Sequence, residues 1–332
     1  MTRVHTVRLA LRDWDWLTPL LLHEVPTPAL DALEARLVID RVGTLIDPWQ
    51  DGPGPYAGFE ISLARLNRAV LTGDHRVVAL PHPLMQSFRQ RCLIVARDSP
   101  FQAPQDLRGG RIGVTGWIDS GNTWTRAVLA DAGVPISAAR WVAGRLTAAH
   151  PEQDRLDGHG RPGWIEAAPT GSWMTALLSA GELDAVCTPF MPPGFFAPDA
   201  PWRPLYADVR AAELDYADRW GLVPVHHLLG FAADGFDPDL AAAVSQALAE
   251  SRRIWRERRR RYAETSMWLA ADLLTEATRL PADWDAPEFA AQRAGIAEFT
   301  RQQRDQGITD RAADPEELFA SAIDHRLLEG TS

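Results

Sequence analysis

Cysteine is scarce in this chain of 332 residues. The two cysteines, Cys92 and Cys187, form neither a CxxC motif nor the spacing of a metal site. We therefore expect both to be small, buried hydrophobic side chains. Long apolar runs are missing as well. The longest one near the N-terminus, Leu20 to Leu22, is far too short to cross a membrane.

Positive charge is also in short supply. The 34 basic residues are outnumbered by 44 acidic ones, which gives a net charge of −10 and a pI near 5.4. This balance argues against a nucleic-acid partner, because phosphate binding needs a basic face. The first residues have no basic start, apolar core or cleavage site of an export signal. We therefore expect a cytoplasmic protein that has no membrane partner.

Several familiar fingerprints of catalysis are absent from the sequence. It contains no Ser-His-Asp arrangement, no P-loop and no dinucleotide-binding motif. Gly109, Gly110 and Gly113 do not match G-x-G-x-x-G, and they come before a predicted strand instead of after it. The sequence thus gives no support for a serine hydrolase, a nucleoside triphosphatase or a nicotinamide-dependent enzyme.

What the sequence does contain is an α/β pattern interrupted by two apolar runs, at 92–97 and 224–231. Each run reads as a strand that carries the chain from one set of βα units to another. We predict a two-lobed α/β protein that has a ligand cleft between the lobes. The predicted lobes are residues 1–95 with 225–332, and residues 96–224.

The C-terminal part, from about residue 238 to 328, carries almost only helical signal. It exceeds what a minimal two-lobed protein requires, so these helices could mediate homo-oligomerisation. The basic run at 252–261 is interpreted as a solvated helix face with Ile254 and Trp255 turned inward.

One stretch near the middle of the chain has the clearest local pattern. Arg111 to Thr115 is a short β-branched run that predicts a buried strand, and a helix is predicted from Thr123 to Ala132. Gly133 would close this helix, and Ser120 or Asn122 would cap its start. A strand, a polar loop and a helix start together place backbone N–H groups and a positive dipole end at the ligand edge of a sheet. We predict that a small anion binds there.

The loop before that helix contains further candidate ligand-binding residues. Trp117 lies in the loop itself, where an exposed indole would be suited to stacking on a flat ligand. Ser120, Asn122 and Thr123 add side-chain hydrogen-bonding groups.

A set of short motifs is spread from about residue 7 to 234. The set includes Phe59-Glu60-Ile61-Ser62, Phe88-Arg89, Asp106-Leu107-Arg108-Gly109, Trp124-Thr125-Arg126, and the Pro224-Val225-His226-His227 segment. On these motifs the chain resembles the 4,5-dihydroxyphthalate decarboxylase-like proteins, a branch that has the type 2 periplasmic-binding-protein fold. The resemblance implies a lyase that removes CO2 from a small, hydroxylated aromatic carboxylate.

The resemblance also implies roles for particular residues. Arg126 or Arg89 would clamp the carboxylate, and the Trp117 and Trp124 indoles would form a flat slot. His227 would be the general acid, since a histidine exchanges protons near neutral pH. His226 is its neighbour on a predicted strand, so the two side chains point to opposite faces. His82 is predicted to be a second acid. Glu60, Ser62 and Asp15 are predicted to be further substrate contacts.

Some alternatives remain open at the level of sequence. No cofactor is predicted; a divalent metal could be held by His82, His227 and Glu60, but no spacing favours this. Asp13 and Asp15 alternate with two tryptophans, which would place carboxylates and indoles on opposite sides of an extended segment. The same fold could serve a non-catalytic small-anion binding protein, such as a solute-binding or sensor protein, or another lyase or dehydratase.

Overall fold

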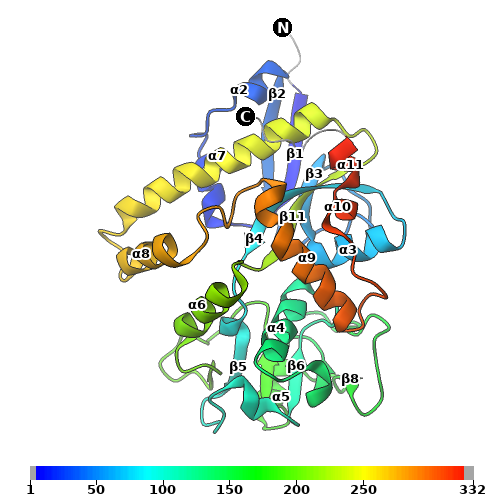
Figure 1. The fold of residues 1–332 in the computed structure, drawn as a ribbon, viewed down its shortest axis with the longest axis vertical. Coiled ribbons are helices and arrows are strands. Elements are labelled where there is room, and N and C mark those ends of the chain that lie inside the picture. Colours follow the sequence, from blue (N-terminus) through cyan, green and yellow to red (C-terminus); the bar gives the residue numbers. More distant parts are fainter. Residues whose placement is uncertain (1–4, 325–332) are drawn as a thin grey trace. The chain divides into compact units, whose positions relative to one another are not determined.

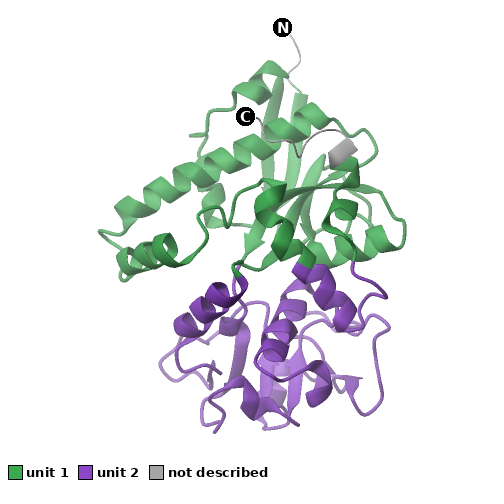
Figure 2. Cartoon of the chain, in the orientation of Figure 1, with its two compact units in different colours: residues 1–86, 221–297, 313–332 green, residues 87–220, 298–312 purple. Residues whose placement is uncertain are grey.

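The computed structural model describes residues 5–324, which form two compact units (Figure 2). Unit 1 comprises the described parts of 1–86, 221–297 and 313–332, and unit 2 comprises 87–220 and 298–312. Each unit is built around one sheet with helices packed against it (Figure 1). Among residues 5–324, no helix combines the length and apolar character that crossing a membrane would require.

The sheet of unit 1 has five strands in the order β2-β1-β3-β11-β4. Only β11 runs antiparallel to its neighbours, because it returns to this sheet after the chain has built unit 2. The strand β3 is buried along its whole length, as expected for a central strand of a covered sheet. The strands are β1 (His5–Leu11), β2 (Ala35–Arg41), β3 (Gly58–Ser62), β4 (Val77–Gln86) and β11 (Val225–Ala232).

The longest helix of unit 1, α7 (Pro238–Tyr262), begins at a well-formed cap. The Asp237 side chain accepts hydrogen bonds from the backbone N–H groups of Asp239 and Leu240. The buried positions of α7 repeat at helical spacing and form the stripe that faces the unit's core. The other helices are η1 (Asp15–Leu17), α1 (Thr18–Leu21), α2 (Pro28–Ala32), α3 (Leu63–Leu71), α8 (Leu269–Arg279), α10 (Pro315–Leu318) and α11 (Ala320–Asp324).

The sheet of unit 2 has six strands in the order β10-β5-β9-β6-β7-β8, and here only β5 runs against its neighbours. The strands are β5 (Leu93–Ala96), β6 (Arg111–Val114), β7 (Arg140–Ala143), β8 (Ile165–Ala167), β9 (Ala185–Cys187) and β10 (Trp202–Pro204). The helices are η2 (Gln90–Cys92), η3 (Pro104–Leu107), α4 (Ser120–Asp131), η4 (Ile136–Ala138), α5 (Met174–Ser179) and α6 (Val209–Trp220). Cys92 and Cys187 are both free and buried, as predicted, and burial raises the pKa of the Cys187 thiol to about 12.

The predicted fold class is confirmed: an α/β protein of two units whose C-terminal part is helical. Each sheet is parallel apart from one strand beside a crossing of the chain. The unit boundaries differ from the prediction, which placed all of 225–332 in the first lobe. Residues 298–312, the second half of α9 (Phe289–Asp305) and the turn after it, group with unit 2. They do so because Phe299 packs on Trp124 and Gln306 bonds to Arg126.

The start of α4 also differs from the prediction. The helix begins at Ser120, with Asp119 at the N-cap position and no side-chain cap. Asn122 does not cap because it lies within the first turn of the helix; its amide N–H₂ donates to Thr115 Oγ1 and to the carbonyl of Gly116. The C-terminal end agrees with the prediction, since Gly133 follows the helix with φ of 82°.

The interpretation of 252–261 as a solvated helix face was wrong in one respect. The Arg252 side chain turns inward: its guanidinium lies 4.3 Å from the Trp16 ring centroid and donates to the carbonyls of Pro83 and Asp285. Burial lowers the pKa of Arg252 to about 9. Arg256 pairs with the Asp285 carboxylate and Arg259 with Glu276 of α8, so much of the basic run connects α7 to other segments of unit 1.

Candidate functional site

The hydrogen-bonded pair of Glu60 and His227 is the most chemically capable arrangement in unit 1. Because β11 runs antiparallel to β3, His227 lies directly opposite Ser62. Side chains alternate along a strand, so Glu60, two residues before Ser62, points to the same face as His227. The register therefore brings His227 Nδ1 to 2.6 Å from Glu60 Oε1.

The Glu60 carboxylate is fully buried and accepts three hydrogen bonds. Its second oxygen, Oε2, accepts from the backbone N–H of Arg12 and from Trp14 Nε1–H, both at 2.9 Å. Arg12 and Trp14 follow the end of β1, which pairs in parallel with β3, so this edge of the sheet supplies both donors. The carboxylate is thus fixed from two sides.

The carboxylate determines which nitrogen of His227 can act. Since Glu60 accepts the proton of Nδ1, the other ring nitrogen, Nε2, is left to take or give a proton. The His227 side chain is 13% exposed, which leaves part of it open to a ligand or to water. A histidine oriented by a buried carboxylate is a general acid–base arrangement.

His82, the second predicted acid, has a different environment. It is buried on β4, and its Nδ1 lies 2.8 Å from Ser245 Oγ of α7. Burial, together with the nearby Arg252 charge, lowers the pKa of His82 well below its ordinary value. Within residues 5–324 no three His, Cys, Asp or Glu side chains gather as a metal site needs, so the alternative metal set of His82, His227 and Glu60 is not assembled.

The segment after β1 is not extended as the sequence suggested. Residues 15–17 form a 3-10 turn, in which the Asp15 carboxylate accepts from the backbone N–H of Trp16. Asp15 is exposed, whereas Trp16 is buried beneath Arg252. In this segment, Trp14 donates its indole N–H to Glu60, a contact that the sequence did not predict. The only sequence signal for it is a tryptophan just beyond a strand end.

In unit 2, the start of α4 lies against Arg89. The Arg89 side chain is buried, and its Nη2 donates to the carbonyl of Thr188 at 2.8 Å. The guanidinium lies against Gly121: if residue 121 had a side chain, its Cβ would be 3.0 Å from Arg89 Nη2 and 3.2 Å from Arg89 Cζ. Its Nη1 makes no hydrogen bond to another described residue. A guanidinium and the first turn of a twelve-residue helix both favour an anion.

Arg126, the other predicted clamp, is held by the protein itself. Its Nε donates to Gln306 Oε1 at 2.7 Å and its Nη2 to the Trp117 carbonyl at 2.6 Å. The guanidinium also lies 4.2 Å from the Trp117 ring centroid. Burial lowers the pKa of Arg126 to about 10. These contacts make it a residue that ties the 117 loop and residues 298–312 to α4.

The predicted aromatic slot is not formed by Trp117 and Trp124. Trp117 is 1% exposed and packs edge-on against Trp141 inside the core of unit 2. Trp124 is fully buried against Phe299. Ser120, Asn122 and Thr123 are buried too. Asn122 Oδ1 and Thr123 Oγ1 make no hydrogen bond within the described part of the chain. Ser62, opposite His227 in the sheet, is buried as well.

No family model matches the chain. Among curated proteins, the 4,5-dihydroxyphthalate decarboxylase of Comamonas testosteroni is 27% identical over 278 residues, which cover 79% of this chain and 82% of that protein. The 4,5-dihydroxyphthalate decarboxylase of Pseudomonas putida is 29% identical over 162 residues, 47% of this chain and 61% of that protein. Both relatives are named as enzymes.

Solved structures with a similar chain course include the periplasmic aliphatic sulphonate binding protein SsuA from Escherichia coli, with 16% identity and a TM-score of 0.49. That match covers 94% of this chain and 91% of the other. The desulfurization enzyme DSZB matches with 16% identity and a TM-score of 0.46, over 97% of this chain and all of the other. At these values the structural likeness says nothing about activity. The resemblance seen in the sequence is confirmed by the curated relatives: the chain is similar to the Comamonas testosteroni 4,5-dihydroxyphthalate decarboxylase over most of its length and to the Pseudomonas putida one over about half of it.

Proposed function

We propose that this protein is a decarboxylase acting on a small, hydroxylated aromatic carboxylate, with His227 as the proton donor. The observation that carries the proposal is the 2.6 Å hydrogen bond between His227 and the buried Glu60. The names of the two curated relatives support the reaction class. Sequence identities of 27% and 29% leave the substrate itself as part of the proposal.

The proposed chemistry needs one proton and no redox step. The ring carbon that bears the carboxylate takes a proton from His227 Nε2, assisted by electron release from a ring hydroxyl. The bond from that carbon to the carboxylate then breaks, its electron pair restores the aromatic ring, and CO2 leaves. A proton from water returns His227 to its starting state. Glu60 holds Nδ1 throughout, so that the reacting nitrogen keeps one position.

For the substrate carboxylate we propose Arg89 over Arg126. Arg126 donates through Nε and Nη2 to Gln306 and Trp117 and is stacked on an indole, which leaves only its Nη1 without a partner among the described residues. Arg89 donates to Thr188 and lies against the first turn of α4. A guanidinium binds a carboxylate with paired, charge-assisted hydrogen bonds, and the helix start adds to the attraction. Gly121 is the residue whose missing side chain lets the guanidinium lie so close to the helix.

We further propose that the reaction needs no cofactor, because proton transfer and the loss of CO2 from a hydroxylated ring can both be assisted by the side chains named above. Dialysis of the protein against EDTA should leave its turnover unchanged. Loss of turnover that returns on addition of a divalent cation would contradict this part of the proposal.

The test of the function is a search for turnover. The protein is incubated with hydroxylated benzoates and phthalates in D2O, while released CO2 and thermal stabilisation are measured. We expect one substrate to release CO2 and to give a product with one deuterium at the carbon that lost the carboxylate. Stabilisation by a ligand without CO2 release would favour a small-anion binding protein. A product that keeps its carboxylate would point instead to another lyase or a dehydratase.

A further inference from the structure

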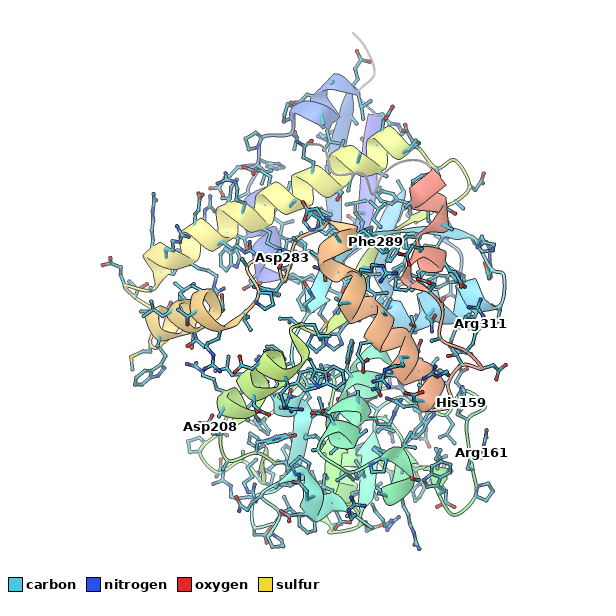
Figure 3. The ribbon with its side chains drawn as sticks, in the orientation of Figure 1. His159, Arg161, Asp208, Asp283, Phe289 and Arg311 are labelled. Carbon is cyan, nitrogen blue, oxygen red and sulfur yellow. The ribbon has the colours of Figure 1, made fainter. Side chains whose placement is uncertain are left out.

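The turn that joins α7 to α8 exposes an unusual concentration of apolar side chains. Met267 is 80% exposed, Trp268 75%, Leu274 67% and Tyr262 42%. These side chains lie within residues 260–274, which we call the hairpin tip. Figure 3 draws the side chains of α7 and α8. A fully exposed aromatic side chain presents about 150–250 Å². The four side chains therefore leave roughly 500 Å² of mostly apolar surface open to water, near the upper limit for a monomer.

The helix α8 adds a second indication that a surface is left uncovered. Its apolar residues recur at helical spacing, including Leu269, Leu273 and Leu274, yet none of its eleven residues is buried. A surface helix of a globular protein normally buries such a stripe. In this chain the stripe of α8 has no complete cover in the described structure.

The hairpin tip is nevertheless held in a defined conformation. Arg259 of α7 forms two hydrogen bonds to the Glu276 carboxylate of α8, at 2.9 and 2.8 Å. Trp268 adopts a left-handed backbone conformation, with φ of 71°, immediately before α8. This conformation is costly for a bulky residue and is usually kept where a function depends on it. The apolar surface is thus presented in a fixed form.

The charges at the hairpin tip have both signs. Arg260 and Arg261 are exposed, as is Glu264, and none of these three side chains forms an ion pair with another described residue. A patch that binds a second copy of itself across a two-fold axis must be self-complementary, with an apolar centre and charges of both signs. An anionic membrane surface would instead favour a uniformly basic rim, and the chain as a whole carries a net charge of −10.

We propose that the hairpin tip is the contact surface for a second copy of this chain, in a two-fold symmetric dimer. Trp268, Met267 and Leu274 of the two copies form the centre, and Arg261 of each copy faces Glu264 of the other. Covering both tips buries roughly 1,000 Å² of apolar surface, which with the flanking polar residues meets the lower limit for a stable interface. The proposal is independent of the catalytic role assigned to His227.

The experiment measures the mass of the full chain by sedimentation velocity. The wild-type protein is expected to be a dimer and Trp268→Glu a monomer. Arg261→Glu and Glu264→Arg should each weaken the dimer at least about tenfold, because each places like charges opposite one another. The double variant Arg261→Glu with Glu264→Arg should restore it. Phe196→Glu, at an exposed aromatic residue in unit 2, is the matched control and should remain dimeric.

Three results would overturn the proposal. One is a monomeric wild-type chain, and a second is a Trp268→Glu variant that remains a dimer. The third is a double charge-reversal variant whose dimer is no tighter than the dimers of the single variants. This comparison remains valid even if Trp268→Glu fails to fold. A monomeric wild-type protein that sediments with phosphatidylcholine–phosphatidylserine vesicles would assign the hairpin tip to a membrane surface instead.

Discussion

Two histidines of unit 1, on neighbouring antiparallel strands, have opposite environments. His227 of β11 pairs with a carboxylate and keeps part of its ring accessible. His82 of β4 is buried and pairs with a hydroxyl, and both burial and Arg252 disfavour its charged form. The comparison shows that the partner and the access to solvent, more than the residue type, determine whether a histidine can exchange protons with a ligand.

Replacing the two histidines in turn should give the largest contrast. His227→Gln removes the proposed proton donor, and we expect the rate of CO2 release to fall by about 10²–10⁴-fold. His82→Gln should leave this rate nearly unchanged in whatever fraction of the protein is folded. Steady-state kinetics and circular dichroism on both variants provide the measurement. Equal losses of activity in the two folded variants would remove the distinction between the two residues.

The pH dependence of stability should separate them as well. In the folded protein the pKa of His82 is lowered, so below the ordinary value of about 6.5 the unfolded chain binds a proton that the folded chain does not. The stability that His82 contributes is therefore complete above that pH and is lost as the pH falls. The slope approaches about 1.4 kcal/mol per pH unit. Urea unfolding from pH 7.5 to 5 should show a shallower decline for His82→Gln than for the wild-type protein.

A smaller effect is expected from Trp14. Trp14→Phe removes the indole N–H that donates to Glu60 Oε2 but leaves the Arg12 backbone donor and the His227 bond in place. The loss of one hydrogen bond to a charged group is worth about 1.5–3 kcal/mol, of which the rate should show only part. We expect kcat to fall by about tenfold with little change in KM. An unchanged kcat would mean that Glu60 does not need this contact.

The sequence predicted the fold better than the site, and particular residues show why. The strands near 92–97, 111–115 and 224–231 follow from local apolar patterns, and Gly133 marked the end of α4. The contact between Glu60 and His227 depends on the register of two strands that lie 167 residues apart, which no local pattern encodes. Both residues entered the prediction through the family resemblance, but their hydrogen bond did not.

Trp117 and Arg126 show the opposite failure. A tryptophan in a loop was predicted to be exposed, yet Trp141 and the Arg126 guanidinium cover it. Residues 298–312 complete that packing, and their return to unit 2 could not be read from a helical pattern that continues without interruption. Loop residues with long-range partners are therefore poorly predicted from the sequence alone.

The central claim, that Glu60 holds His227 in position for proton transfer, is tested most directly with Glu60→Gln. An amide keeps the shape of the side chain but can present its N–H₂ group to the ring, so the tautomer of His227 is no longer fixed. We predict that kcat for CO2 release falls by at least about a hundredfold while the dissociation constant of the substrate stays within about threefold. A folded Glu60→Gln variant with wild-type kcat would contradict the account.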